Sequence, residues 1–269
     1  MCKIILILAW LLPLSVCAQT ILPMGGKANS MANSIVAMED VWSFHHNPGA
    51  LARFEKVAFG ICYENRFLLK ELQSQGLVYV QPLKKGVISA GAQIYGFDLY
   101  RSTRIGAGYS LLLADNFSAG VQMNYQGIQL REQYGSLHSV TAELGLLVNI
   151  TDKWKMGCSV FNLGRAKLSA YQNERMGTIF RLGTSYKLSN KVLFTLEADK
   201  NIFYPIRVKT GMDYQPLNNF FIRAGLSTEP LEGAFGMGYK FNRIQLDLGT
   251  SYHQTLGWSP HFSIQYSAN

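Results

Sequence analysis

The sequence predicts an all-β fold, a transmembrane antiparallel up-and-down β-barrel of about 14 strands. Charged residues make up only 16% of the 269-residue chain, against roughly 25% in soluble domains. Apolar and polar side chains alternate along most of the chain, as in strands with two different faces. The alternating segments reach about ten residues or more, whereas strands of soluble sheets average about 5–6. These lengths favour strands that cross a membrane, which need about 9–11 residues.

The segment from residue 117 to residue 126 illustrates this alternation. Val121 and Met123 lie on one face of the expected strand, and Gln122 and Asn124 on the other. Lipid outside and a polar lumen inside account for both faces. A soluble β-sandwich, the alternative, would bury the charged residues that recur on the polar face, and charged side chains are almost never buried without partners.

The number and spacing of the segments predict a closed barrel. They begin near residues 56, 72, 86, 103, 116, 137, 154, 175, 191, 205, 219, 232, 243 and 259. An even number of strands is what bacterial single-chain barrels have. Short connections, such as residues 84–85 and 189–190, alternate with longer ones, such as 65–71 and 165–174. We expect the short turns on the periplasmic side and the longer loops outside.

Residues 1–18 are expected to form a cleaved secretory signal peptide. Lys3 precedes an apolar run, and the small Ala18 stands at the expected cleavage site. The alternative is a lipoprotein with Cys17 as the lipidated residue, although Val16 is bulkier than the residue that usually precedes such a cysteine. Export and a barrel together predict the outer membrane of a Gram-negative cell.

Composition also restricts the partners of the mature chain. Its cysteines, Cys62 and Cys158, fall on opposite faces of their strands, so no disulfide is expected. The net charge of +8 is compatible with acidic headgroups, and outer-membrane lipid is an expected partner. Nucleic acid is not expected, because the chain has no basic cluster. Nothing in the sequence predicts a cofactor.

Residues 19–55 precede the barrel, which we assign to residues 56–269, and lack alternation of membrane length. A barrel of about 14 strands encloses more space than wall side chains fill. The economical prediction is a plug inside the lumen. A loose periplasmic tail is the alternative.

The plug region carries a pattern that can be compared with a known family. Gly25, Gly26, Asp40, Asn47 and Pro48 stand ahead of a barrel of this size, and the arrangement resembles the FadL-like superfamily of outer-membrane β-barrels. The resemblance implies that a small N-terminal hatch closes a fourteen-stranded barrel. These five residues are the hatch-motif residues, and the resemblance makes them candidates for binding.

Within that superfamily the chain looks most like the PorV/PorQ branch, which is associated with type IX secretion, and like similar small barrels of unassigned role. Strings such as VFNLGRAKLSAY from Val160 and FIRAGLSTEP from Phe221 carry this likeness over nearly the whole mature chain. Gly49 and Ala50 invert the usual order after Asn-Pro, and the chain is shorter than typical members. Long loops that could hold partners are therefore mostly absent.

A set of charged residues falls on the lumen face of the predicted strands. This lumen charge ladder comprises Arg104, Glu143, Arg181, Glu197, Arg207, Asp213, Arg223 and Asp247, with Glu64, Lys187, Asp199 and Lys209 on the same face. We expect pairs of opposite sign between neighbouring strands, such as Arg181 with Glu197 and Asp213 with Arg223. Their expected role is structural, to tie down the plug; a polar path or ligand-binding wall is the alternative. Neither sign dominates, so no selectivity ring is predicted.

Two other groups of residues could carry chemistry. His45 and His46 could bind a zinc-like ion, but their spacing defines no geometry, and we expect them to be hydrogen-bonding residues of the plug. Ser251 and His253 share a strand face and imitate a nucleophile and its base. No third, orienting group can be named, so we expect no enzyme. Because the spacing of the two histidines defines no ligand geometry, we also expect no metal site.

An apolar trio at residues 67–69 lies in an expected outer loop, where it would be costly in water. Either it folds over the barrel mouth or it forms a docking or hydrophobic-ligand entry surface.

The sequence leaves two hypotheses for function. The first is a PorV/PorQ-type scaffold or secretion-linked subunit, with other envelope or secretion proteins as partners. The second is a FadL-type channel that admits a hydrophobic small molecule. The second predicts a continuous apolar pocket between plug and wall, and the first predicts none. The polar lumen and short loops favour the first.

Overall fold

A computed structural model describes residues 23–130, 135–167 and 175–268 of the chain. The expected signal peptide, residues 1–18, and Cys17 lie outside the described residues, and so do the first residues of the expected plug.

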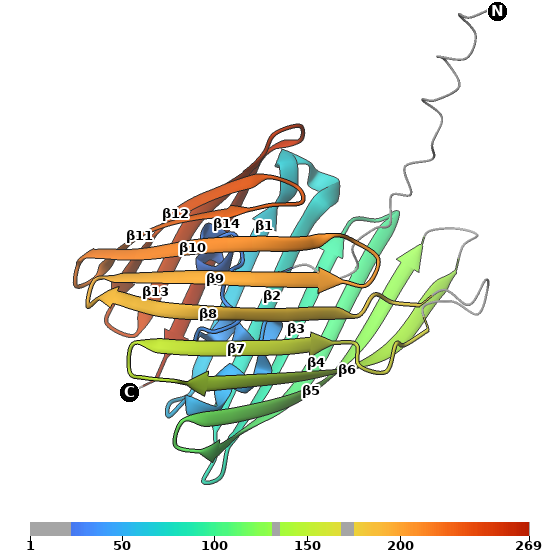
Figure 1. The fold of residues 1–269 in the computed structure, drawn as a ribbon. Coiled ribbons are helices and arrows are strands. Elements are labelled where there is room, and N and C mark those ends of the chain that lie inside the picture. Colours follow the sequence, from blue (N-terminus) through green and yellow to red (C-terminus); the bar gives the residue numbers. More distant parts are fainter. Residues whose placement is uncertain (1–22, 131–134, 168–174, 269) are drawn as a thin grey trace, which may run out of the picture.

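The described chain forms a closed antiparallel barrel of fourteen strands, which confirms the predicted fold class (Figure 1). The strands are β1 (Ala58–Asn65), β2 (Gln73–Pro82), β3 (Val87–Gly96), β4 (Tyr100–Ala114), β5 (Phe117–Leu130), β6 (Ser136–Asn149), β7 (Trp154–Phe161), β8 (Ile179–Ser189), β9 (Val192–Asn201), β10 (Ile206–Leu217), β11 (Phe220–Ser227), β12 (Glu232–Phe241), β13 (Ile244–His253) and β14 (Gly257–Ser267). Each strand pairs with the next along the chain, and β1 closes the barrel against β14.

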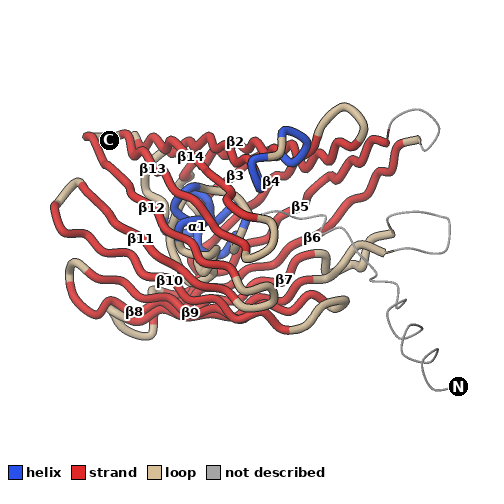
Figure 2. The backbone as a smooth tube through the Cα atoms, turned by 90° about the horizontal axis from the view of Figure 1, so that it is seen from above, coloured by secondary structure: helices blue, strands red, loops and turns tan. Residues whose placement is uncertain are grey.

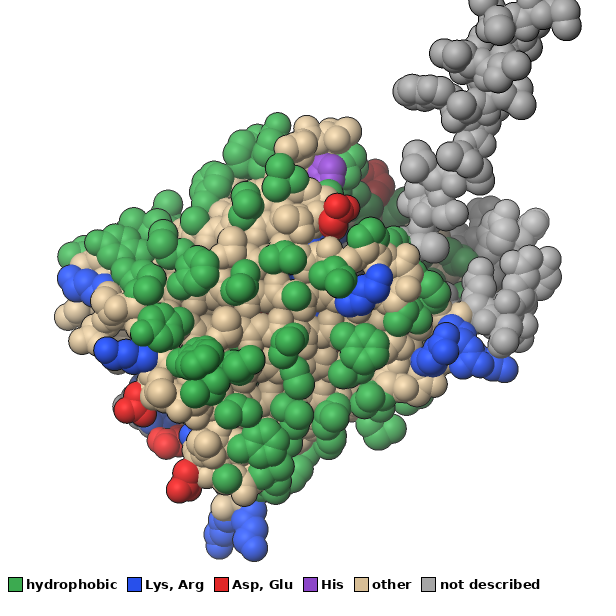
Figure 3. Space-filling model, in the orientation of Figure 1, with side chains coloured by type: hydrophobic (Ala, Val, Ile, Leu, Met, Phe, Trp, Pro, Cys, Tyr) green, Lys and Arg blue, Asp and Glu red, His purple; other side chains and the backbone are tan. Residues whose placement is uncertain are grey.

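The alternation along each strand decides which side chains meet lipid. Val121 and Met123 are 55% and 65% exposed on the outside, whereas Gln122 and Asn124 are buried inside. Apolar side chains cover the outer face, and Lys and Arg side chains gather toward its edges (Figure 3). A band of this kind is typical of a barrel in a bilayer.

The strand boundaries follow the sequence pattern except at two loops. Strand β8 begins at Ile179 rather than near residue 175, because Arg175 forms an isolated bridge with Lys167 in the preceding loop. Strand β4 begins earlier than expected, at Tyr100, because β5 extends far enough to pair Leu130 with it.

Every connection at the barrel end that also holds the C-terminal end of β14 has only two to four residues, as at 190–191 and 242–243. We call this the periplasmic end, following the usual asymmetry of such barrels. The longer connections, including η4 (Arg66–Leu68) and η5 (Lys70–Leu72), lie at the other end.

Residues 23–57 form a plug inside the barrel, as the seen-from-above view shows (Figure 2). The plug has short helices, α1 (Gly26–Ser30), η2 (Val41–His45) and η3 (Pro48–Arg53). Across the described residues, no helix has both the length and the apolar character needed to span a membrane.

Candidate functional site

Most of the predicted site residues lie at the interface between the plug and the lumen wall. One part of this interface, on β1–β3, is mainly apolar. Wall glycines make room there for plug side chains: Gly60 meets Trp42, Gly76 meets Met24 and Gly91 meets Phe44. A Cβ atom at Gly91 would lie 2.5 Å from Phe44 Cε1. The wall at these positions is therefore only as thick as the backbone.

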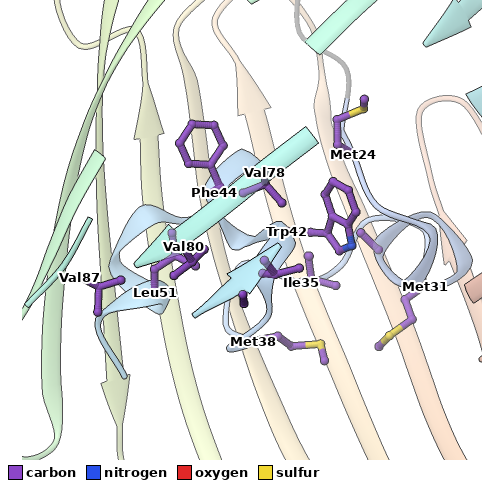
Figure 4. Packing of buried hydrophobic residues seen from close by; sticks show 13 residues of the cluster. Met24, Met31, Ile35, Met38, Trp42, Phe44, Leu51, Val78, Val80 and Val87 are labelled. Atoms are coloured by element: carbon purple, nitrogen blue, oxygen red, sulfur yellow. The ribbon is translucent and has the colours of Figure 1, made fainter. Parts of the chain in front are cut away.

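The plug side chains continue into a buried apolar cluster with wall valines of β2 and β3 (Figure 4). The cluster comprises Met24, Ala28, Met31, Ile35, Met38, Val41, Trp42, Phe44, Leu51, Ala58, Val78, Val80 and Val87. Its burial holds the plug against one side of the barrel by the hydrophobic effect. Apolar packing between plug and wall is thus concentrated on β1–β3.

Farther round the barrel, on β5 and β6, the plug backbone itself rests on the wall. A Cβ atom at Gly120 would lie 2.5 Å from the carbonyl carbon of Pro48, and one at Gly145 would lie 2.7 Å from the amide nitrogen of Gly49. Ser118 Oγ donates to the carbonyl of Gly49 at 2.9 Å. Glycine is required here because no side chain fits between the two backbones.

The hatch-motif residues form hydrogen bonds and turns that shape the plug. Asn47 Nδ2 donates to the Val36 carbonyl at 2.6 Å, and Asn47 Oδ1 accepts from Gly49 N at 3.0 Å. Pro48 follows as the first residue of η3, where its missing N–H costs nothing. Asn47 also donates to the Leu146 carbonyl at 3.0 Å, which ties this turn to β6.

The other three hatch-motif residues lie near α1 and η2. Gly25 has φ +107°, a conformation that favours glycine. Gly26 N donates to Ser263 Oγ of β14 at 3.0 Å. Asp40 caps η2 by accepting from Trp42 N at 3.0 Å. All five hatch-motif residues therefore shape or anchor the plug, and their predicted role in binding stays a prediction.

The lumen charge ladder falls into two layers, an outer one and an inner one nearer the periplasmic end, and plug residues contact both. The outer layer contains Arg104, 2.8 Å from Glu143, and Lys209, 3.1 Å from Glu197. Glu197 also accepts the amide of plug residue Val36 at 2.9 Å. Beside them, Arg207 and Lys209 both pair with Asp199. Buried charges in this arrangement satisfy one another and hold the plug.

The expected pair of Arg181 with Glu197 does not form. Strand register places Arg181 opposite Asp199, and Glu197 opposite Lys209. Arg181 instead donates to the carbonyls of His45 and His46 in the plug, each at 3.4 Å. Pairing by sign alone missed the two-residue offset in register.

The inner layer lies toward the periplasmic end. Arg223 is 3.2 Å from Asp213 and 2.6 Å from Asp247, so the expected pair of Asp213 with Arg223 is present. Lys27 of the plug lies 3.2 Å from Asp40 and 4.0 Å from Asp213. Lys27 was not singled out from the sequence, because only the folded plug brings it to this layer.

His45 and His46 are fully enclosed in the plug. Burial, with the positive charges of Arg104 and Arg181, lowers their pKa values well below the ordinary imidazole value. His46 Nε2 lies 2.9 Å from the Met24 carbonyl, and neutral histidine can donate there. Among the described residues, no group of three His, Cys, Asp or Glu side chains converges as metal ligands would.

Ser251 and His253, which imitate a nucleophile and its base in the sequence, do not form a catalytic pair in the structure. His253 Nδ1 accepts the backbone amides of Thr255 and Leu256, at 3.1 and 3.2 Å, and so closes its own turn. Ser251 lines a small polar cavity above α1. His253 is thus occupied as a structural acceptor.

The three residues of the apolar trio differ in their surroundings. Phe67 turns toward the barrel mouth, where its amide donates to Ser259 Oγ at 3.0 Å and its ring packs edge-on against His253. Leu68 and Leu69 are exposed.

Two cavities bear on transport. The one above α1, lined by polar residues that include Asn29, Glu64 and Arg66, has a volume of 40 Å³, enough for a few waters. An apolar groove of 430 Å³ lies on the outer face of β1–β3, and the exposed side chains of Ile61, Leu77 and Ile94 line it.

No protein-family model matches the chain, and no curated protein matches it either. Among solved structures, it is similar to the CymD monoaromatic hydrocarbon channel, with a TM-score of 0.72 at 12% identity over 93% of this chain and 98% of that one. The Ralstonia pickettii toluene transporter TbuX follows, with a TM-score of 0.69 at 12% identity over 91% and 98% of the two chains. A Pseudomonas aeruginosa FadL homologue gives 0.61 at 12% over 92% and 98%. The chain has a FadL-like fold.

The glycines that seat the plug were the main functional feature missed in the sequence. Gly120, Gly145 and Gly211 all fall on the polar face of their segments. A small residue recurring where polar side chains are expected was the available signal of a close approach to another backbone.

Proposed function

We propose that this protein is an outer-membrane channel of the FadL type that admits small hydrophobic compounds, with the plug as its hatch. The FadL-like barrel and its apolar outer band support the location. The neighbours described as monoaromatic hydrocarbon channels and toluene transporters support the class of cargo.

The observation that carries this proposal is the apolar groove on β1–β3. Its volume of 430 Å³ falls in the range of small-molecule sites, roughly 300–1,000 Å³. On the other side of the same wall stand Met24 and Trp42 of the plug, separated from the groove by Gly76 and Gly60. An apolar compound in the outer leaflet would therefore meet an apolar surface on both sides of a thin wall.

Filling the groove tests the proposal. Ala92 lines the groove, and Ala90 is exposed two residues away on the same face of β3. Ala92→Phe should lower uptake of radiolabelled toluene by Gram-negative cells about tenfold, the effect of losing about 1.4 kcal/mol of binding. Ala90→Phe adds the same ring outside the groove and should leave uptake unchanged. Equal uptake by both variants and the wild type would contradict entry at this groove.

A scaffold or secretion-linked subunit of PorV/PorQ type is the second candidate, favoured by how closely the plug is seated. Plug backbone packs on wall glycines such as Gly120 and Gly145, and the enclosed cavity above α1 is polar and small. Native mass spectrometry after mild-detergent extraction distinguishes the candidates. A bound apolar molecule supports the channel, and a stoichiometric envelope protein supports the scaffold.

A further inference from the structure

A pocket of 190 Å³ opens at the periplasmic end, between the plug and the ends of β7, β8 and β9. Glu39 of the plug lies on one side, and Lys153, Lys155 and Lys187 of the wall lie around it. The pocket is distinct from the apolar groove on β1–β3 and from the polar cavity above α1.

The charges around this pocket do not balance. Glu39 lies 2.7 Å from Lys155 and 3.5 Å from Arg53, so one carboxylate serves two cations. Lys153 and Lys187 form no ion pair with any residue that the structure describes. The amide of Lys187 donates to the carbonyl of Lys153 at 2.8 Å, which holds these two lysines side by side. Like charges held together in a recess attract an anion.

The remaining wall of the pocket is partly apolar. Met38 and Leu193 line it, and both belong to or pack on the buried plug cluster. Ser185 Oγ donates to the Ala37 carbonyl at 2.9 Å, which fixes the plug segment that forms this wall. A ligand with an anionic group and a short apolar part matches both surfaces.

We propose that this pocket binds a small organic anion from the periplasm, a phosphate or carboxylate with a short apolar portion. The anionic group lies between Lys153 and Lys187 and competes with Glu39 for Lys155. The apolar portion rests on Met38 and Leu193. This site is independent of the compound that the barrel conducts.

Isothermal titration of the intact mature protein in micelles with butyl phosphate tests the site. Lys153→Gln with Lys187→Gln should weaken binding at least about tenfold, a loss of about 1.4 kcal/mol. Glu39→Gln should tighten binding, because it removes the competing carboxylate. Inorganic phosphate, which lacks the apolar portion, should bind more weakly than butyl phosphate. A folding defect would not produce opposite shifts in the two variants.

The matched control is Lys84→Gln with Lys85→Gln, which removes the same charge from another periplasmic turn. It should bind butyl phosphate as the wild type does. Equal weakening of binding in both double variants would mean that the positive charge of the whole periplasmic rim attracts the anion, and this result would overturn the proposal. Undetectable binding of butyl phosphate to the wild type at millimolar concentration would overturn it as well.

Discussion

Arg223 Nη1 lies 2.6 Å from Asp247 Oδ1 inside the barrel, and neither side chain is exposed to solvent. Asp213 approaches the same guanidinium at 3.2 Å, and Lys27 of the plug approaches Asp213. This cluster joins three strands and the plug around Arg223 and Asp247, which are fully buried, while Asp213 and Lys27 are 11% and 16% exposed. Its integrity should therefore matter more than that of any ion pair on the surface.

Asp247→Asn should destabilise the barrel by about 3–5 kcal/mol, because removing one partner leaves a buried charge undercompensated. Denaturant unfolding in micelles, followed by gel mobility without boiling, measures this. Asp98→Asn is the control, since Asp98 is 82% exposed and lies 3.6 Å from Arg101. It should change stability little. A similar effect of both changes would contradict the importance of burial.

Gly145→Ala should loosen the plug, because the added Cβ atom would meet the Asn47 side chain and lie 2.7 Å from Gly49 N. Overpacking of this kind costs about 1–3 kcal/mol. Limited proteolysis should cut the plug faster in this variant. Gly233→Ala places the same methyl group in open space on β12 and should leave proteolysis unchanged. Equal protection of the plug from proteolysis in both variants would show that the contact between plug and wall at Gly145 can accommodate an added methyl group.

Acidification should destabilise the protein through His45 and His46. Their pKa values are lowered in the fold, so below about pH 6.5 the unfolded chain binds more protons than the folded one. The free energy of unfolding should then fall with decreasing pH, by up to about 1.4 kcal/mol per pH unit for each histidine.

Unfolding measured between pH 7.5 and pH 5, about the range in which histidine titrates, checks this expectation. His45→Gln with His46→Gln should flatten the pH dependence, whereas His138→Gln on the exposed outer face should not. An unchanged slope in the double variant would mean that other groups set the acid sensitivity.

A cross-link between plug and wall should stop transport if the plug must move. Met24 Sδ lies 3.8 Å from Cys62 Sγ of β1. Met24→Cys should form a disulfide with Cys62 on oxidation, which mass measurement verifies, and toluene uptake should fall until a reductant is added. With Cys62→Ser in the same background, oxidation should have no effect. Undiminished uptake by the cross-linked protein would show that transport does not require the plug to move away from β1.

Much of the barrel was predictable from the sequence because a strand is a local structure. The period of two places Val121 toward lipid and Gln122 toward the lumen without reference to any other segment. Errors occurred where distant residues decide the boundary, as at Ile179, which follows a loop closed by the bridge of Lys167 with Arg175.

The site was predictable only in its parts. The ladder residues face the lumen as expected, but which of them pair depends on register, and Arg181 consequently contacts the plug rather than Glu197. The contacts of Lys27, and of Glu39 with Lys155, depend on the path of the plug. A segment without a repeating pattern carries no local signal of that path.

The amino-acid sequence by itself determined the strands, their number and the face that each presents, because alternation and length are properties of neighbouring residues. Only the tertiary structure decided where the plug rests and which charges meet. Those outcomes depend on closing β1 against β14 and on glycines such as Gly120 and Gly145, which let two backbones distant in the chain come into contact.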